Sequence, residues 1–279
     1  MPSTRGPAEV DLSGFVDLHV HAGPDVRPRR LDDLEVARQA AEAGMAGCLL
    51  KSHVTITADR AAIAQKVVPR VRVFGAVALN REVGGLNPAA VEVALKLGAV
   101  EVWLPTFSAR GKAGQPGGIT VLDESGGLLP VVREILALVR DADAILGTGH
   151  LSLSEISIVV RAAKEMGLRK VLVTHPENES IVGMPVEMQR DLAELGAWFE
   201  RCYVSTLEPG SRVTVESIAG QIRAVGPRST IVSTDLGQSD NPTPVEGLRA
   251  YAGALLAAGL TLDELRLIAA ENPARLVGI

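Results

Sequence analysis

FVDLHVH, residues 15–21, is the first of eight short apolar runs that divide the chain. Asp17, His19 and His21 stand at alternate positions in this run. The period of a β-strand therefore places all three on one face and the apolar residues between them on the other. A buried face that carries two imidazoles must satisfy their nitrogens, and a metal ion does this for both rings at once. Taken alone, the pair is also typical of two hydrogen-bonded strand histidines.

Seven further runs rich in Val, Leu and Ile follow, separated by longer amphipathic segments that predict helices. The alternation continues from Phe15 to the C-terminus without a segment typical of a linker, which predicts one domain over residues 1–279. The eight expected strands are 15–21, 46–53, 72–79, 99–105, 144–150, 169–175, 197–204 and 229–235.

The segments between these strands carry signals for helix ends. A Ser or Thr followed three residues later by Glu predicts a capping box, and a glycine just after an amphipathic segment predicts a helix end. Proline at a first helical position costs nothing, because its missing N–H has no partner there anyway. The boxes are Ser152 with Glu155, Thr243 with Glu246 and Thr261 with Glu264; the proline is Pro244 and the glycines are Gly44, Gly167 and Gly259.

Eight units of strand and helix either close into a barrel or open into a doubly wound sheet, because both architectures share this alternation. No Gly-rich dinucleotide fingerprint follows the first strand. The sequence therefore favours a single-domain, TIM-like (β/α)8 barrel of the α/β class, without an appended β-sandwich domain. Residues 107–127 are Gly-rich, polar and too long for an ordinary connection. This segment is either a lid over the site or a surface loop or oligomer contact.

All five histidines fall at the C-terminal ends of expected strands, where α/β barrels hold their active sites. His150 ends AILGTGH, His175 ends KVLVTH and Asp235 ends TIVSTD, each after apolar residues of the barrel wall. Each of the three also has an ordinary explanation, as a helix N-cap or a hydrogen-bonded core residue. Imidazoles and a carboxylate that converge from different strands are ligands for a divalent ion, so together with His19 and His21 they predict a metal site.

The composition favours a small-molecule partner. Charged residues make up 22% of the chain and the net charge is −5, without a basic run that would suit nucleic acid or an anionic membrane surface. Cys48 and Cys202 stand far apart, and residues 1–10 lack the apolar core of a secretion signal. The apolar runs are shorter than the roughly 20 residues that cross a bilayer. We expect a cytoplasmic protein with reduced thiols, and a homo-oligomer is compatible with the sequence.

With these residues in place, the chain resembles the amidohydrolase superfamily. The resemblance rests on D-x-H-x-H ending strand one, one histidine each ending strands five and six, and an aspartate ending strand eight. It extends to ENPARLVGI, residues 271–279, which is similar to the closing Asn-Pro-Ala-x-x-Leu-Gly segment common there. Zinc suits such ligands first, with manganese, iron and nickel as alternatives. The resemblance implies a metal-dependent hydrolase with one ion on His19, His21 and Asp235 and a second on His150 and His175.

A lysine marks one departure from the family pattern. Two-metal members of the superfamily often bridge their ions with a carboxylated lysine at the end of strand four, where this chain has Trp103 and no visible ligand. Lys51 instead ends strand two, with His53 two residues on and therefore on the same face. A free ammonium beside metal ions is repelled, so Lys51 is either carbamylated and bridging or directed toward a substrate anion.

Further residues are candidates for contact with a substrate. His53 is a substrate contact, a partner that orients a ligand, or a structural hydrogen-bonding residue. Arg27, with two further arginines in the first loop, either grips a substrate carboxylate or is a solvated loop charge. Trp103 is assigned to substrate binding. Asp17, below the metal site, either orients a histidine or makes an ordinary buried hydrogen bond.

The expected reaction is hydrolysis of a small-molecule carbonyl compound: an amide, cyclic imide, ester or lactone. A divalent ion lowers the pKa of bound water from about 15.7 toward about 7, so metal-activated hydroxide attacks at neutral pH. The second ion, or His175 and His53 if one ion binds, polarises the carbonyl, while Asp235 accepts the water proton and passes it to the leaving group. The alternatives, in order, are a mononuclear decarboxylase or other lyase on the same barrel, a phosphoesterase, and a catalytically inactive binding module.

Overall fold

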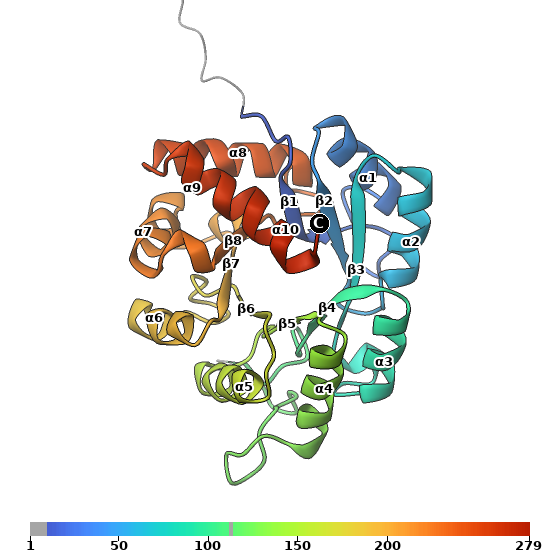
Figure 1. Cartoon of the computed structure of the whole chain (residues 1–279), viewed down its shortest axis with the longest axis vertical. Coiled ribbons are helices and arrows are strands. Elements are labelled where there is room, and N and C mark those ends of the chain that lie inside the picture. Colours follow the sequence, from blue (N-terminus) through green and yellow to red (C-terminus); the bar gives the residue numbers. More distant parts are fainter. Residues whose placement is uncertain (1–9, 112–113) are drawn as a thin grey trace, which may run out of the picture.

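The computed structural model describes residues 10–111 and 114–279, and its strands form one ring (Figure 1). Eight parallel strands follow one another in chain order. All eight expected strands are confirmed, each inside its expected range. They are β1 (Val16–His21), β2 (Gly47–Lys51), β3 (Arg72–Ala78), β4 (Ala99–Trp103), β5 (Ile145–Gly147), β6 (Val171–Thr174), β7 (Trp198–Cys202) and β8 (Thr230–Ser233).

Helices α1 to α8 lie around the outside of the ring, and α10 lies in front of it (Figure 1). The three expected capping boxes are confirmed at the starts of α5, α8 and α9, and the three expected glycines follow the ends of α1, α5 and α8 with positive φ. The helices are α1 (Asp33–Glu42), α2 (Ala58–Val67), α3 (Pro88–Lys96), α4 (Pro130–Asp141), α5 (Leu153–Glu165), α6 (Val186–Glu194), α7 (Val215–Val225), α8 (Pro244–Ala257), α9 (Leu262–Arg266) and α10 (Asn272–Val277). Pro244 is the first residue of α8, as expected.

The ring closes where the C-terminal ends of β1 and β8 meet. The backbone N–H of His21 donates to the carbonyl of Leu236, and that of Asp235 donates to the carbonyl of His19, both at 2.8 Å. This contact between the first and last strands confirms the barrel and excludes the doubly wound sheet. It also places the polar ends of β1 and β8 side by side.

The apolar core has an inner and an outer layer. The inner cluster takes residues from seven strands around the ring, among them Leu18, Trp103 and Ile231. Residues on opposite sides of a ring meet only inside it, so this cluster fills the barrel interior. The outer layer joins strands to helices, as where Val36 of α1 packs with Leu50 of β2.

The strict in–out alternation expected for residues 15–21 is wrong. Leu18 lies in the inner cluster, whereas Val20 packs in the outer layer. The pairing of β1 with β2 shifts register between Asp17 and Val20, with one extra residue on β1. Such an extra residue reverses the alternation. The Asp17 carboxylate binds backbone groups. Its Oδ1 accepts hydrogen bonds from the backbone N–H of His19 at 3.1 Å and from that of Thr234 at 3.0 Å.

The closing segment of the chain covers the opposite end of the barrel from the histidines. Figure 1 shows α10 in front of the ring, and Leu276 packs into the inner cluster. Asn272 is fully buried, and its Nδ2 donates to the carbonyl oxygens of Pro227 at 2.8 Å and Thr230 at 2.7 Å. These two bonds tie the C-terminal helix to the start of β8.

The long segment 107–127 connects β4 to α4 on the side of the histidines. Its Thr120 hydroxyl donates to the Glu155 carboxylate at 2.6 Å, which anchors it to the start of α5. Phe107, its first residue, is 46% exposed and reaches the site described below. Residues 112 and 113 lie outside the described part of the chain. A role as lid stays a prediction.

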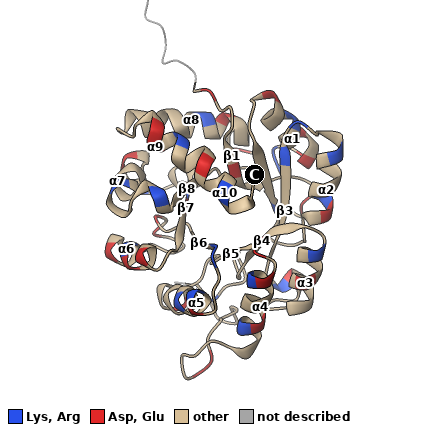
Figure 2. Cartoon of the chain, viewed as in Figure 1, with Lys and Arg blue, Asp and Glu red and all other residues tan. Residues whose placement is uncertain are grey.

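The outer surface carries mixed charge. Acidic and basic residues are interspersed over the outer helices in Figure 2. Over residues 10–111 and 114–279, no helix is both long enough and apolar enough to cross a membrane. The buried polar groups inside the ring are therefore a stronger indication of function than the surface.

Substitution of Gly237 tests the closure of the ring. Gly237 has a φ of +141°, and an added Cβ would overlap the carbonyl oxygen of His21. Gly237→Ala is expected to lower the free energy of unfolding by about 2–4 kcal/mol, because the backbone beside β1 must shift. Gly220→Ala in α7 is the matched control, since a Cβ there meets nothing within 4 Å. Urea unfolding compares the two, and equal stability would contradict the close approach.

Candidate metal centre

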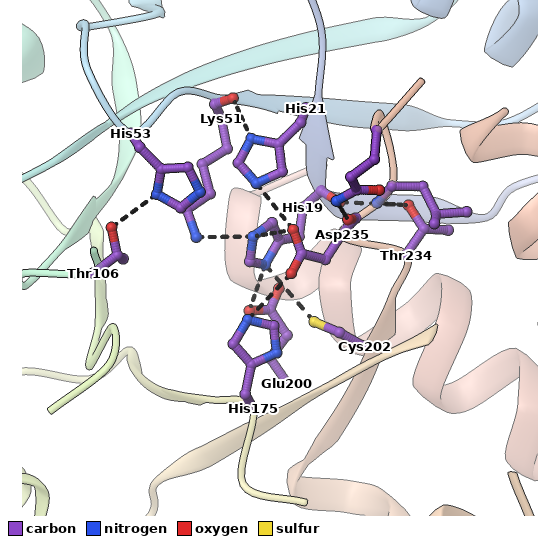
Figure 3. Close-up of polar contacts among 12 residues, drawn as sticks. His19, His21, Lys51, His53, Thr106, His175, Glu200, Cys202, Thr234 and Asp235 are labelled. Carbon is purple, nitrogen blue, oxygen red and sulfur yellow. Dashed lines mark hydrogen bonds and ion pairs between the residues drawn. The ribbon is translucent and has the colours of Figure 1, made fainter. Parts of the chain in front are cut away.

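The Asp235 carboxylate lies at the centre of a cluster at the C-terminal ends of the strands (Figure 3). Its Oδ1 is 3.1 Å from Nε2 of His19 and 2.9 Å from Nε2 of His21. Its Oδ2 is 3.2 Å from Nε2 of His175. Three imidazoles from two strands thus converge on one carboxylate, and all four residues were candidates from the sequence.

Two of these residues have unusual backbone conformations. His175, directly after β6, and Asp235, two residues after β8, both have a φ of +52°. This left-handed conformation costs a non-glycine residue about 1–3 kcal/mol and is concentrated at functional sites. Backbone bonds hold it: the N–H of His175 donates to the carbonyl of Glu200 at 3.2 Å, and that of Asp235 to His19. The surrounding barrel therefore maintains the geometry that aims both side chains at the cluster.

The other edge of His19 faces two residues that the sequence analysis missed. Its Nδ1 is 3.0 Å from Oε2 of Glu200 and 3.8 Å from Sγ of Cys202, both on β7. A carboxylate on one imidazole nitrogen fixes the ring and presents the other nitrogen to a ligand. The alternation of Glu and Cys in WFERC was the available signal. His19, His175, Cys202 and Asp235 offer ligand atoms within 4.8 Å of one another.

Lys51 lies buried inside the barrel beside His19. Its Nζ is 2.8 Å from Nε2 of His19 and 4.4 Å from the centroid of the Trp103 ring. Glu101 on β4 is also fully buried, and neither of its carboxylate oxygens has a hydrogen-bond partner within the described part of the chain. Sequence reasoning missed Glu101, although it alternates with Trp103. The barrel interior therefore holds one amine and, with Glu200, two carboxylates.

His53 lies on the outer side of this cluster. Its Nδ1 is 2.8 Å from Oγ1 of Thr106. Its ring is stacked between those of His21 and Phe107, with centroid separations of 4.7 and 3.8 Å. Both ring faces are thus covered, and only the edges of the imidazole remain open to polar partners.

His150 lies beside the Asp235 cluster. Its ring centroid is 5.6 Å from that of His175 and 6.4 Å from that of His53. A cavity of about 280 Å³ opens over these side chains. The residues that line it include His21, His53, His150, His175, Asp235, Arg27, Arg29, Phe107, Ile181 and Val204.

The two remaining residues that the sequence assigned to substrate binding, Arg27 and Trp103, lie in different parts of the barrel. The guanidinium of Arg27 lies over the Phe107 ring, 4.3 Å from its centroid, at the edge of the cavity. Arg29, also at the cavity, is paired with Asp25 at 2.8 Å. Trp103 is fully buried beneath Lys51, in the inner cluster. The structure thus places Arg27 at the edge of the cavity and Trp103 in the barrel interior.

Burial and nearby charges set the protonation of the cluster. Burial lowers the pKa of His19, but the carboxylates of Asp235 and Glu200 together outweigh it and the pKa rises to about 8. Burial lowers the pKa of His21 to about 4 and also lowers the pKa of Lys51. Burial of Asp235 is outweighed by His19 and by hydrogen bonds from three imidazoles, which hold its pKa well below the usual value. Asp235 is therefore ionised and His21 neutral at pH 7.

This donor set fits a divalent metal ion. Zn2+ binds imidazole nitrogen and carboxylate oxygen at about 2.0–2.2 Å, which places neighbouring ligands of a tetrahedron about 3.3 Å apart. The N···O distances around Asp235, 2.9–3.2 Å, are close to this spacing. The neutral His21 imidazole and the ionised Asp235 carboxylate are in the protonation states that bind metal, and His19, whose pKa is about 8, would release a proton when an ion binds. His19, His21, His175 and Asp235 can therefore hold an ion with little rearrangement, with Cys202 nearby.

Several solved structures have a similar barrel. An amidohydrolase from Pseudomonas aeruginosa is similar in structure, with a TM-score of 0.66 and 16% identity over 95% of both chains. So are a dipeptidase described as a metallopeptidase, with 0.62 and 15% over 95% of this chain and 98% of that one, and a 2,6-dihydroxybenzoate decarboxylase from Rhizobium, with 0.60 and 14% over 95% and 99%. At identities of 14–16% the likeness shows the fold, and the chain has the same (β/α)8 barrel as these enzymes.

The sequence also matches a family model. Residues 14–200 match the model of DUF6282, described as a family of unknown function, and the chain belongs to this family. The matched part contains His19, His21, Lys51 and His175, whereas Asp235 lies beyond it. No curated protein matches the chain.

The buried histidines predict a loss of stability in acid. Burial lowers the pKa of His53, and the neighbouring His21 lowers it further. Below about pH 6.5 the unfolded chain therefore binds a proton at His53 that the folded protein does not. Stability from this group is present above its unfolded pKa of about 6.5 and is lost as the pH falls below it, by about 1.4 kcal/mol per unit. With a chelator present, wild type should lose about 2 kcal/mol more than His53→Gln between pH 6.5 and 4.5. Urea unfolding measures this, with Thr106→Ser as control, and parallel pH profiles for wild type and His53→Gln would contradict it.

Proposed function

We propose that this chain is a metal-dependent hydrolase acting on the carbonyl group of a small molecule, an amide, cyclic imide, ester or lactone. The observation that carries the proposal is the convergence of three imidazole nitrogens on the ionised Asp235 carboxylate at the mouth of a barrel. A bound divalent ion, with zinc first, would supply an activated water and a Lewis acid for the carbonyl. His19, His21 and Asp235 would hold it, with His175 directed at the same point.

Asp235 is the group of this chain that would move a proton. Its carboxylate is ionised and reaches the cavity, with a side-chain exposure of 13%. A carboxylate in this position can accept a proton from water and return it to the leaving group. The backbone bond from its N–H to the carbonyl of His19 holds Asp235 beside the cavity, whether or not the imidazoles bind an ion.

The walls of the cavity suit a small substrate with a polar end. Phe107, Ile181 and Val204 provide apolar surface that excludes water. Arg27 offers a positive charge at the edge of the cavity, positioned by its contact with Phe107. A carboxylate or other anionic group on the substrate would pair with it. The volume of about 280 Å³ is at the small end for ligand pockets.

Lys51 supports a two-metal version of the site. Burial lowers the pKa of its amine, and a deprotonated amine is the form that reacts with carbon dioxide. Its Nζ lies 2.8 Å from Nε2 of His19 and thus at the ligand cluster. We propose that Lys51, carbamylated by carbon dioxide with loss of a proton, would help to hold a second ion together with His150 and His175.

A lyase is the second candidate. The compact group around Asp235 is sufficient for one ion, and His150 stands apart from it, with its ring 5.6 Å from that of His175. A single ion with an unmodified Lys51 would favour decarboxylation or another C–C cleavage. The number of ions therefore separates the two functions.

Metal content provides the direct test. Elemental analysis after loading with Zn2+ should give two ions per chain in wild type, and Zn2+ at 100 times its dissociation constant should add about 2.7 kcal/mol to stability for each site. His21→Ala should lose the first ion and the gain from that site. His150→Ala and Lys51→Met should each retain one ion, and density or mass at Lys51 should show the carbamate in wild type. Absence of metal binding by folded wild type would contradict the proposal.

Asp235→Asn tests the role in proton transfer. The substitution keeps the shape of the side chain and one ligand oxygen, so the fold and much of the metal should remain. Turnover of a responsive substrate, found in a panel of amides, imides, esters and lactones, should fall at least 100-fold, because the acceptor for the water proton is lost. Asp191→Asn, at an exposed position of α6 on the outside of the barrel, is the control. Full activity in Asp235→Asn would show that another group is the base.

A further inference from the structure

A buried asparagine fixes the hydrogen bonds around His53. Asn80 follows β3 and is fully buried. Its Oδ1 lies 2.9 Å from the backbone N of Thr106 and 3.0 Å from that of Ser108. Both of these groups are donors, so the amide oxygen must face them and Nδ2 must face the opposite side.

The orientation of Asn80 determines what the Thr106 hydroxyl can do. Nδ2 of Asn80 donates to the carbonyl of His53 at 2.9 Å and to Oγ1 of Thr106 at 2.6 Å. Oγ1 is therefore an acceptor toward Asn80, and its own hydrogen needs a different partner. Nδ1 of His53, 2.8 Å away, is the acceptor for it among the described residues.

The opposite arrangement would leave a donor unsatisfied. If Nδ1 of His53 carried a hydrogen, Oγ1 of Thr106 would accept twice and its hydroxyl hydrogen would have no acceptor in the described part of the chain. Thr106 is 2% exposed, so water is not a ready substitute. Buried hydroxyl groups are almost always paired, and the pairing thus selects the tautomer.

We infer that Asn80 and Thr106 are positioning residues that hold His53 as the neutral Nε2–H tautomer, with this N–H presented to the cavity as a donor to a substrate oxygen. The stacking of the ring between His21 and Phe107 keeps it from turning, and His53 lines the cavity. No hydrogen bond to its Nε2 is formed by residues 10–111 and 114–279. An Nε2 that carries a hydrogen cannot bind metal, so His53 is a substrate contact and not a ligand.

The tautomer has a consequence for the substrate. The group that faces His53 must be a hydrogen-bond acceptor, such as the oxygen of a carbonyl or carboxylate, and an N–H or O–H donor would be disfavoured there. This role toward the substrate rests on the proposed function, whereas the tautomer itself does not. The two can therefore fail separately.

Nitrogen NMR of protein labelled with 15N in its histidine rings tests the tautomer. Spectra are recorded at neutral pH, metal-free and with Zn2+, and the His53 signals are those missing from His53→Gln. The expected result is an unprotonated Nδ1 and a protonated Nε2 in both states. A hydrogen on Nδ1, a doubly protonated ring, or a metal-bound Nε2 would each overturn the inference. Failure to bind Zn2+ would overturn the proposed function and leave this assignment standing.

Two substitutions at one position identify the cause. Thr106→Ser keeps the hydroxyl and should keep the wild-type His53 signals. Thr106→Val removes it and should shift them toward the other tautomer or a mixture, because Nδ1 loses its donor. Wild-type signals in a folded Thr106→Val protein would show that Thr106 does not set the tautomer. If Thr106→Val does not fold, the wild-type spectrum still decides the assignment.

Discussion

The bond from the backbone N–H of Asp235 to the carbonyl of His19 is the contact on which the site depends, because it joins the last strand of the ring to the first. This bond holds the side chains of His19 and Asp235 in contact, although they are more than two hundred residues apart in the sequence. The left-handed backbone at Asp235 and His175 is tolerated because such contacts outweigh its cost. A barrel that did not close would leave three imidazoles without their common acceptor.

Ionisable groups of opposite charge are buried together inside the barrel. Lys51, Glu101 and Glu200 are all fully or almost fully buried, and each charge would be costly without the others. Glu200 holds His19 from one side while Lys51 meets it from the other, so the ring is fixed at both nitrogens. Burial, then Glu200, raises the pKa of Glu101, so this carboxyl group is readily neutralised. The site thus extends inward, below the ligands that the sequence makes visible.

The sequence predicted the barrel because its eight apolar runs and its helix caps are local signals, and each could be located without tertiary contacts. The histidines and Asp235 were visible for the same reason, since each ends a strand. Glu101 and Glu200 were not predicted, because a charged residue within a strand points into the barrel or away from it depending on register. The register shift at Asp17 shows the difficulty: one extra residue reversed the alternation on which the sequence argument relied.

Different interactions hold the side chains on the two sides of the site. On the side of β1, β6 and β8, the imidazoles of His19 and His175 contact the Asp235 carboxylate. A metal ion can take the place of the protons between these groups. On the side of β2, β3 and β4, His53 is held by neutral hydrogen bonds from Asn80 and Thr106 and by stacking on both faces. These contacts involve no ionised group and no proposed metal ligand atom, so a bound ion has no proton to displace there. The barrel can therefore combine an adaptable set of ligands with a fixed donor, and the cavity between them is where an oxygen of the substrate would meet both.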